Sequence, residues 1–292
     1  MINGSVAAAL ARAAAANAEP TYQVKLLLNP GTVLDLDGVP LAEPAAALSL
    51  AGDAGFESVQ YMDDDRLSLA GQCWIIRIRR DGDEGRIRLT YKTRFAIEGN
   101  GADPAAVRRA LDRANEVNFD ASDTNYVPQV NLGYARATLD FSNKKREPAP
   151  HLAPGELPGT EASRALARER MPGKLRNWPR KPAGWADAVT ANSLVYGPVR
   201  QTSYPGRLLG RALEMQVTPL RTASGEPDWF AEITAKAAGL GEAVDLRSEL
   251  IGKLRPEGWL LEREAFKTDV ILVPRPRPRP AAPRPPGDAV TG

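Results

Sequence analysis

The fold is decided by the stretch from Cys73 to Lys92, which reads CWIIRIRRDGDEGRIRLTYK. Two runs of alternating residues flank the glycine-bounded segment 82–85, and this pattern is typical of a β-hairpin. Because side chains alternate between the two faces of a strand, Arg77 and Arg79 share one side of the first strand. The residues that share one side of the second strand are Arg86, Arg88, Thr90 and Lys92. One face of the hairpin therefore carries a ladder of cations.

This ladder of cations has two interpretations. On a solvent-facing sheet the cations are ordinary solubilising charges, and the core is reached by the alternating residues Ile76, Ile78, Ile87 and Leu89. In a sheet closed into a barrel the same cations point inward, where they require a counter-anion because unpaired buried charge is costly. The hairpin alone does not choose between the two.

The sequence on either side of the hairpin predicts a mainly β protein. Strands are expected at residues 22–28, 33–36, 56–62, 132–141, 193–202, 212–218 and 229–235. One helix is expected to begin at Asp103-Pro104, and a second at 242–254, where the buried stripe is Ala243, Leu246, Leu250 and Leu254. Because strands dominate in both halves, we expect one β-rich domain.

The composition shifts at three places along the chain. Residues 1–20 form an Ala-rich lead, which we interpret as a helix or a disordered segment because it lacks the basic start of an export signal. Residues 144–183 are rich in Pro, Arg, Gly and Ala, with a helical pattern at 161–170, so we expect a flexible insertion within a domain that spans 21–273. Alternating Pro and Arg in 274–292 favour an extended, disordered tail.

The net charge and the counts of cysteine and histidine exclude several classes of function. A formal net charge of +2 over 292 residues is too small for wholesale nucleic-acid binding, so a preference for anions must come from local clusters of Lys and Arg. The single cysteine and single histidine exclude most zinc sites and most Cys/His or Ser/His/Asp catalytic arrangements. No apolar run approaches the ~20 residues that span a bilayer. We expect a cytoplasmic protein with no membrane association.

Other features have a structural interpretation beside a functional one. Consecutive acids alternate faces on a strand, so Asp63-Asp64-Asp65 is interpreted as a solvated turn rather than a metal site. Cys73 is expected in the core and His151 on the surface. The basic residues of the insertion, with Trp178 and Trp185 for stacking, fit nucleic-acid binding, but without a recognisable binding fold a solvated segment is favoured.

The order of the segments carries a family resemblance. The chain presents in turn Tyr61-Met62-Asp63, the basic strand 74–79, Leu89-Thr90-Tyr91-Lys92, and the acidic strands 213–218 and 229–234. This order resembles the CYTH family of triphosphate tunnel metalloenzymes, over about residues 21 to 255 with gaps. The resemblance implies an α+β protein, mainly an antiparallel β-barrel of about eight strands with peripheral helices. In such a tunnel, basic residues bind a phosphate chain.

The resemblance assigns phosphate-binding roles to individual residues. The four that match the family's first lysine, central arginines and next lysine are Lys25, Arg77, Arg79 and Lys92. A further basic residue is expected on a later strand, where we prefer Arg200 to Arg136. Guanidinium groups form bidentate bonds to phosphate oxygens, and ammonium groups supply point charge, so these residue types suit the role.

The acidic residues depart from the family's pattern. The positions at which its acids are replaced are Thr21, Gln23, Thr218 and Thr234. Glu214 and Glu232 remain as candidate ligands for Mg²⁺ or Mn²⁺. These ions prefer oxygen ligands and usually need several carboxylates together with substrate phosphates. Losing acids therefore threatens the rate of hydrolysis more than the affinity for phosphate.

Three functions follow from these residues. The first is a CYTH-like domain that binds a phosphorylated or polyanionic small molecule, such as a nucleotide or polyphosphate, with reduced or altered metal-dependent phosphohydrolase activity. The second is an active Mg²⁺- or Mn²⁺-dependent triphosphatase for which Glu214 and Glu232 suffice. The third is a non-catalytic interaction protein that recruits a partner through its basic insertion or its Pro-Arg tail.

Overall fold

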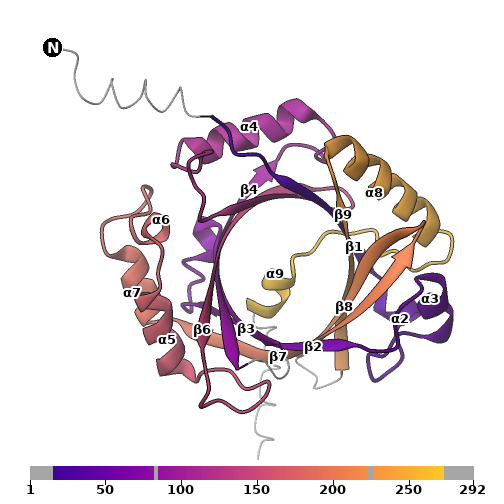
Figure 1. Cartoon of the computed structure of the whole chain (residues 1–292), viewed down its shortest axis with the longest axis horizontal. Coiled ribbons are helices and arrows are strands. Elements are labelled where there is room, and N and C mark those ends of the chain that lie inside the picture. The colour runs from indigo at the N-terminus through magenta and orange to yellow at the C-terminus, as the bar shows by residue number, and fades with distance from the viewer. Residues whose placement is uncertain (1–15, 82–84, 222–226, 273–292) are drawn as a thin grey trace, which may run out of the picture.

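The strands of the computed structural model, which describes residues 16–81, 85–221 and 227–272, form one closed barrel. Nine strands within these residues follow one another around it in the order β1-β5-β6-β4-β3-β2-β7-β8-β9 (Figure 1). Their bounds are β1 Thr21–Leu28, β2 Gly55–Asp63, β3 Trp74–Asp81, β4 Arg86–Ile97, β5 Val127–Leu132, β6 Ala137–Pro148, β7 Leu194–Leu208, β8 Arg211–Arg221 and β9 Pro227–Ala237. Adjacent strands are antiparallel except β1 and β5, which are parallel. The predicted mainly antiparallel barrel is confirmed, with nine strands where about eight were expected.

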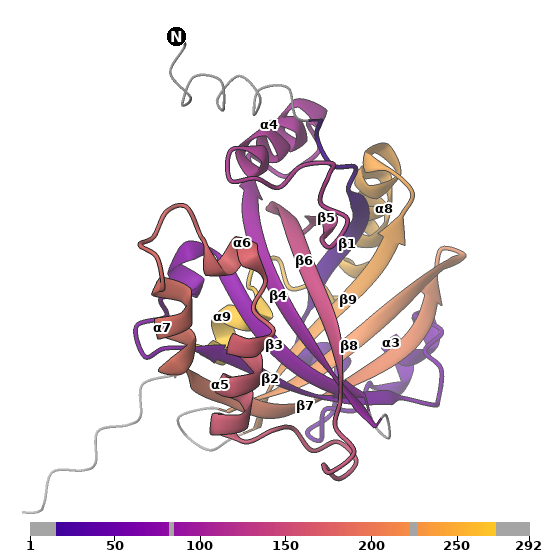
Figure 2. The same cartoon turned by 60° about the vertical axis from the view of Figure 1, so that its left-hand side comes forward.

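All but the last of the described helices surround the barrel and cover its outer face (Figures 1 and 2). Their bounds are α2 Pro30–Val33, α3 Ala42–Ala47, α4 Pro104–Asn115, α5 Thr160–Glu169, α6 Gly173–Arg176, α7 Trp185–Ala191, α8 Leu240–Leu254 and α9 Lys267–Leu272, with a 3₁₀ turn at Ala70–Gln72. The Asp103 carboxylate accepts the backbone N–H of Ala105, so it caps the start of α4 as the sequence predicts. No helix among the described residues is long and apolar enough to cross a membrane.

The barrel carries its apolar side chains on the outside. On the β3–β4 hairpin Ile76, Ile78 and Leu89 are fully buried, and the Tyr91 hydroxyl donates to the Ala167 carbonyl of α5 at 2.6 Å. The alternate positions of the same strands face the lumen, because side chains in a strand alternate between its two faces. Burying the apolar face beneath helices therefore forces the hairpin's cations inward, and the barrel interpretation holds over the solvent-facing one.

Two predicted strands are wrong in detail. The strand predicted at 33–36 does not form: Val33 ends α2, in which Pro30 occupies the first turn, where the missing N–H of proline costs nothing, and Leu34 makes only an isolated bridge to Pro40. The single strand predicted at 132–141 is two strands, β5 and β6, which pair with each other as a hairpin. Its turn is closed by the Gly133 N–H donating to the Arg136 carbonyl at 2.8 Å. Inward-facing and outward-facing residues alternate on both sides of this short turn, so the sequence pattern alone does not reveal the turn.

The segment predicted as a flexible insertion, 144–183, is instead packed against the barrel. β6 pairs with β4 as far as Pro148, and α5 and α6 follow. Ala167, Leu175 and Trp178 are buried, and the Trp178 ring meets the Trp74 ring edge-on at 5.4 Å between centroids. The apolar residues of this segment are few but suitably spaced, so a Pro- and Arg-rich composition misled the prediction. The Ala-rich lead up to residue 15 and the Pro-Arg tail lie outside the described residues.

The last described segment enters the barrel. After α8 the chain passes back toward the lumen, and α9 lies inside the ring of strands in the view of Figure 1. The residues of this segment that line the cavity at that end are Ala265, Phe266, Lys267 and Thr268. The lumen therefore has one end lined by the chain's own C-terminal segment.

Candidate functional site

The lumen contains two cavities that share part of their lining. The larger measures about 650 Å³, and the smaller, of about 120 Å³, lies against the α9 segment. The residues common to both linings are Lys25, Arg77, Arg79, Lys92 and Gln216. The structure thus brings together four of the five predicted phosphate ligands, from β1, β3 and β4, in the middle of the tunnel.

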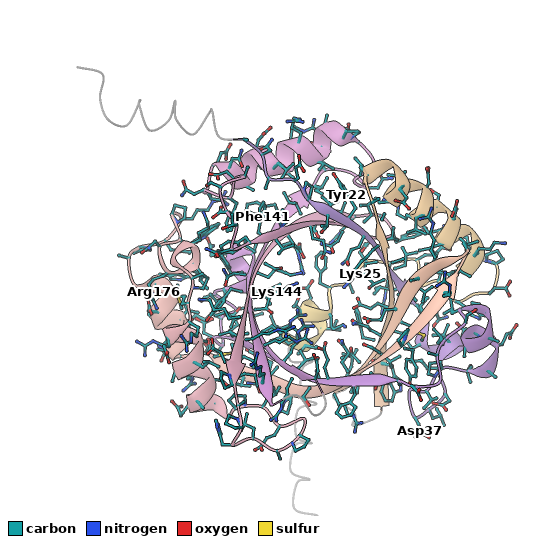
Figure 3. The ribbon with its side chains drawn as sticks, in the orientation of Figure 1. Tyr22, Lys25, Asp37, Phe141, Lys144 and Arg176 are labelled. Carbon is teal, nitrogen blue, oxygen red and sulfur yellow. The ribbon has the colours of Figure 1, made fainter. Side chains whose placement is uncertain are left out.

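Charge in the larger cavity is strongly unbalanced. Its lining contains seven cationic side chains and one carboxylate, that of Glu214. The seven are Lys25, Arg77, Arg79, Lys92, Lys144, Arg211 and Lys236. Figure 3 shows Lys25 and Lys144 inside the ring of strands, whereas Arg176 lies among the outer helices. Such a cavity concentrates positive potential on whatever occupies it.

Arg77 lacks a charged partner. It forms no ion pair with another described residue, and its buried Nε has no hydrogen-bond partner. The Nε of Arg79 and the hydroxyl of Thr90, on the same inner face, are buried without a partner as well. Buried polar groups in proteins nearly always find a partner, so these three unpaired groups are available to water or to a ligand in the cavity.

The other cations of the lumen share a limited supply of carboxylates. Lys92 and Arg94 both contact Asp140, at 2.7 and 3.3 Å. Arg79 contacts Glu57 at 3.1 Å, and Glu57 is also bound by Arg88 at 2.9 Å. Each buried carboxylate therefore balances two cations, and a surplus of positive charge remains.

Burial and the surplus of positive charge lower the pKa values of three lumen cations. Burial lowers the pKa of Lys92 to about 8, and Arg77 and Arg94 add to this shift against the opposing pull of Asp140. Burial, with Arg77 next in effect, lowers the pKa of Arg79 to about 10. The pKa of Lys144 is lowered by burial and by the arginines around it. An anion entering the tunnel would relieve this mutual repulsion.

Glu232 lies at the end of the lumen near α9 and is 2% exposed. Its carboxylate contacts the ammonium groups of Lys267 at 2.9 Å and Lys25 at 3.4 Å. Burial alone would raise its pKa, but the two ammonium groups outweigh burial and lower the pKa of Glu232 to about 2. Of the two predicted metal ligands, this one is thus fully engaged by lysines.

The residues present do not fit a divalent cation. Glu214, the other predicted ligand, accepts a hydrogen bond from Gln216 and lines the larger cavity only. Where the family resemblance expected acids, Gln23 donates to Asn131 and Thr218 donates to Gln201. Among the described residues no three His, Cys, Asp or Glu side chains converge on a point that could hold a metal ion. Mg²⁺ and Mn²⁺ need a richer set of oxygen ligands than this.

The remaining predicted residues line neither of the two cavities. Arg200 is exposed, and its guanidinium stacks on the Phe56 ring at 4.0 Å, so it does not line either cavity. Its competitor Arg136 lines a smaller pocket beside Lys25. His151 is on the surface as predicted, but Cys73 is exposed rather than in the core.

The predicted solvated turn at residues 63–65 is only partly correct. Asp63 is 1% exposed and accepts the backbone N–H groups of Asp64, Leu69 and Ala70. Asp64 organises the same loop by accepting from Ser68. Two of these acids therefore build a loop, and none of the three lines a cavity of the tunnel.

One solved structure shares this architecture. A protein from Hippeastrum, provisionally classed as an adenylyl cyclase and found to have a dominant triphosphatase activity, aligns with a TM-score of 0.52 at 16% identity over 86% of this chain and 94% of that chain. The chain shares the fold of that protein, a closed β-barrel around a tunnel. A provisional adenylate cyclase from Bacillus halodurans aligns with a TM-score of 0.47 at 13% identity, over 86% and 96% of the two chains. No protein-family model and no curated protein matches the sequence.

Several residues of the tunnel were missed by the sequence analysis. Asp140 and Lys144 lie on the inner face of β6, and the polar alternation of Thr138, Asp140, Ser142 and Lys144 is a signal that identifies this face. Lys267 has no such signal, since it lies in a short segment whose place in the tunnel depends on how the chain returns after α8. Its position therefore becomes known only from the folded chain.

Proposed function

We propose that the tunnel binds a phosphorylated or otherwise polyanionic small molecule, and that any metal-dependent phosphohydrolase activity is reduced or altered. The observation that supports this most strongly is the lining of the larger cavity, with seven cations against one carboxylate. A charge-assisted hydrogen bond contributes about 1.5–3 kcal/mol where the donor would otherwise be unpaired. A ligand that reaches Arg77 and its neighbours meets several such donors.

The size of the larger cavity is consistent with a ligand of more than one phosphate group. A cavity of about 650 Å³ falls within the range of small-molecule sites. A single phosphate would contact only a few of the cations, because they come from strands on different sides of the barrel: β1, β3, β4, β6, β8 and β9. A chain of phosphates can contact several of them at once.

Calorimetric titration with tripolyphosphate, in EDTA and separately in Mg²⁺, tests the proposal. We expect binding in EDTA by the unmodified protein and its loss in Arg77→Ala/Lys92→Ala. The matched control, Arg168→Ala/Arg176→Ala, removes two cations from the outer helices and should bind as the unmodified protein does. No heat of binding under either condition would overturn the proposal.

An active triphosphatase is the second candidate, and the activity described for the Hippeastrum protein of similar fold favours it. Steady release of phosphate from tripolyphosphate or a nucleoside triphosphate in Mg²⁺ or Mn²⁺, abolished by Glu232→Gln, would support this candidate over simple binding. The ion-paired lumen carboxylates argue against it, because none is available to a metal ion without displacing a lysine or an arginine.

Recruitment of a nucleic acid by the basic insertion has less support. Three of its cations are already paired with acids: Arg170 with Glu147, Lys174 with Asp123, and Arg176 with Asp187. Trp178, considered for base stacking, is 4% exposed. Binding of a partner that survives Arg77→Ala/Lys92→Ala, and is lost when residues 274–292 are deleted, would favour an interaction protein instead.

A further inference from the structure

Lys267 places an ammonium group inside the tunnel. The side chain is 12% exposed, and its Nζ lies 2.9 Å from the Glu232 carboxylate. The same Nζ donates to the side-chain oxygens of Gln216, at 3.0 Å, and of Gln201. An ammonium group has three N–H donors, so three oxygen acceptors saturate it. Lys267 is therefore held in a closely fitted cation site built by β7, β8 and β9.

The position of this ammonium group conflicts with that of a metal ion. Glu232 is the more deeply buried of the two glutamates that the sequence offers as metal ligands, and Lys267 already lies against its Oε1. A divalent ion bound to the same oxygen would lie within a few ångströms of a fixed positive charge. At that separation, repulsion between the two positive charges offsets much of the attraction that one carboxylate contributes.

No neighbouring carboxylate among the described residues makes up for this. Asp140 is bound by Lys92 and Arg94, and Glu214 accepts from Gln216. Besides Lys25 and Lys267, the polar side chains that share a cavity lining with Glu232 include the amides of Gln201 and Gln216. This pocket is suited to an ammonium ion with one negative charge beside it, rather than to a divalent ion that needs several.

We propose that Lys267 is a built-in cation that takes the place of a divalent metal ion at Glu232 and excludes Mg²⁺ and Mn²⁺ from the tunnel. A polyanion would then meet protein ammonium and guanidinium groups where a metalloenzyme presents a metal ion. This second statement rests on the proposed function, whereas the exclusion of the metal does not.

Titration of Mn²⁺ into the full chain, with free Mn²⁺ followed by its electron paramagnetic resonance signal, tests the exclusion without any phosphate. We expect the unmodified protein and Lys267→Arg, which keep the positive charge, to bind no Mn²⁺ at Glu232. Lys267→Met removes the charge but keeps an unbranched side chain. It should raise the affinity for Mn²⁺ roughly tenfold or more, because the repulsion from one unit charge at this distance exceeds the ~1.4 kcal/mol that corresponds to a factor of ten. Lys25 remains beside Glu232, but its side chain is 38% exposed and can turn away.

Two further variants make the test decisive. Lys267→Met/Glu232→Gln should lose the gained affinity, which assigns the new site to this carboxylate. If Lys267→Met does not fold, as judged by circular dichroism, Lys267→Gln keeps a donor for the neighbouring amides and is used instead. Binding of Mn²⁺ by the unmodified protein that Glu232→Gln removes would overturn the inference. So would a folded Lys267 variant with no gain in Mn²⁺ affinity.

The test of metal exclusion by Lys267 and the test of the proposed function have different readouts. Tripolyphosphate titration in EDTA measures anion binding, and the Mn²⁺ titration measures exclusion of the metal. Failure of tripolyphosphate to bind would reject the polyanion ligand while leaving the role of Lys267 at Glu232 to be decided by Mn²⁺ alone. Tripolyphosphate binding that requires Mg²⁺ would reject the substitution of protein cations for a metal ion.

Discussion

Replacing Arg77 by alanine should weaken anion binding without weakening the fold, and this combination separates a binding site from a structural one. Arg77 faces the lumen without an ion-pair partner among the described residues, and its Nε is buried and unpaired. Its charge also lowers the pKa values of Lys92 and Arg79, which means that it repels both in the ligand-free protein. A residue with these properties stabilises a bound anion and destabilises the empty tunnel.

The magnitudes follow from those contacts. Loss of one or two charge-assisted hydrogen bonds, at about 1.5–3 kcal/mol in total, lowers the affinity for tripolyphosphate by roughly ten- to a hundredfold. Relief of the repulsion and of the unpaired Nε offsets the lost packing of the side-chain stem, so the free energy of unfolding should stay within about 1 kcal/mol of the unmodified value or rise. For a domain of this size that is a change in Tm of about 2–4 °C at most.

Arg80 is the matched control, because it is an arginine on the same strand that points the other way. It is 3% exposed and donates to the carbonyls of Ala153, at 2.7 Å, and Glu156, at 3.3 Å, in the segment after β6. Arg80→Ala should therefore lower the free energy of unfolding by about 2 kcal/mol and leave tripolyphosphate affinity unchanged. Calorimetric titration and thermal unfolding of both variants check the pair. The reasoning is refuted if Arg77→Ala unfolds as readily as Arg80→Ala while binding tripolyphosphate normally.

Three other predictions concern protons and packing. The pKa of Lys92 is lowered to about 8 in the empty tunnel, so above that pH the side chain must take up a proton when an anion binds. Tripolyphosphate affinity measured in EDTA should therefore fall between about pH 8 and pH 10. Lys92→Met should bind tripolyphosphate more weakly and should not show the decrease in affinity that is due to Lys92. The pKa of Glu232 is lowered to about 2, so its contribution to the free energy of unfolding is complete above its ordinary pKa and disappears as the pH falls toward 2. In Glu232→Gln this contribution, at most about 3 kcal/mol, should be absent from the pH dependence of stability in acid. An unchanged pH dependence below the ordinary pKa would contradict the assignment. Tyr91→Phe, which removes the bond to the Ala167 carbonyl, should cost about 1 kcal/mol in denaturant unfolding with no effect on tripolyphosphate affinity, whereas an unaltered unfolding midpoint would mean that α5 is not docked there.

The β3–β4 hairpin was predictable because its period of two is unbroken and its turn is rich in glycine. The direction of its cations was not, since both faces of the hairpin satisfy the same alternation. What decides the direction is the packing on the outer face of the hairpin. Part of it comes from the segment whose composition favoured a flexible insertion, where the Ala167 carbonyl accepts from Tyr91 and the Trp178 ring meets that of Trp74. A local pattern therefore fixed the strand, and distant residues fixed its orientation.

Arg200 shows why a position on a late strand is harder to predict. The register of β7 against β2 shifts between Val59 and Tyr61, where the pairing is irregular. A shift of one residue moves every later side chain to the opposite face of a strand. Arg200 therefore points outward onto Phe56, and the signal for the irregularity is the pair Gly197-Pro198, residue types that mark irregular positions in a strand.

The balance of charge in the tunnel links the missing acids to the retained cations. Each carboxylate that remains near the centre, Asp140 or Glu232, is already shared by two cations, while Arg77 and Lys144 have no acid of their own among the described residues. Adding a divalent ion would increase a positive surplus that already lowers the pKa of Lys92, whereas adding a polyanion would reduce it. The same electrostatic excess that opposes a metal ion thus favours a phosphate chain, so under the proposed function loss of the acids and retention of the cations are one adaptation rather than two.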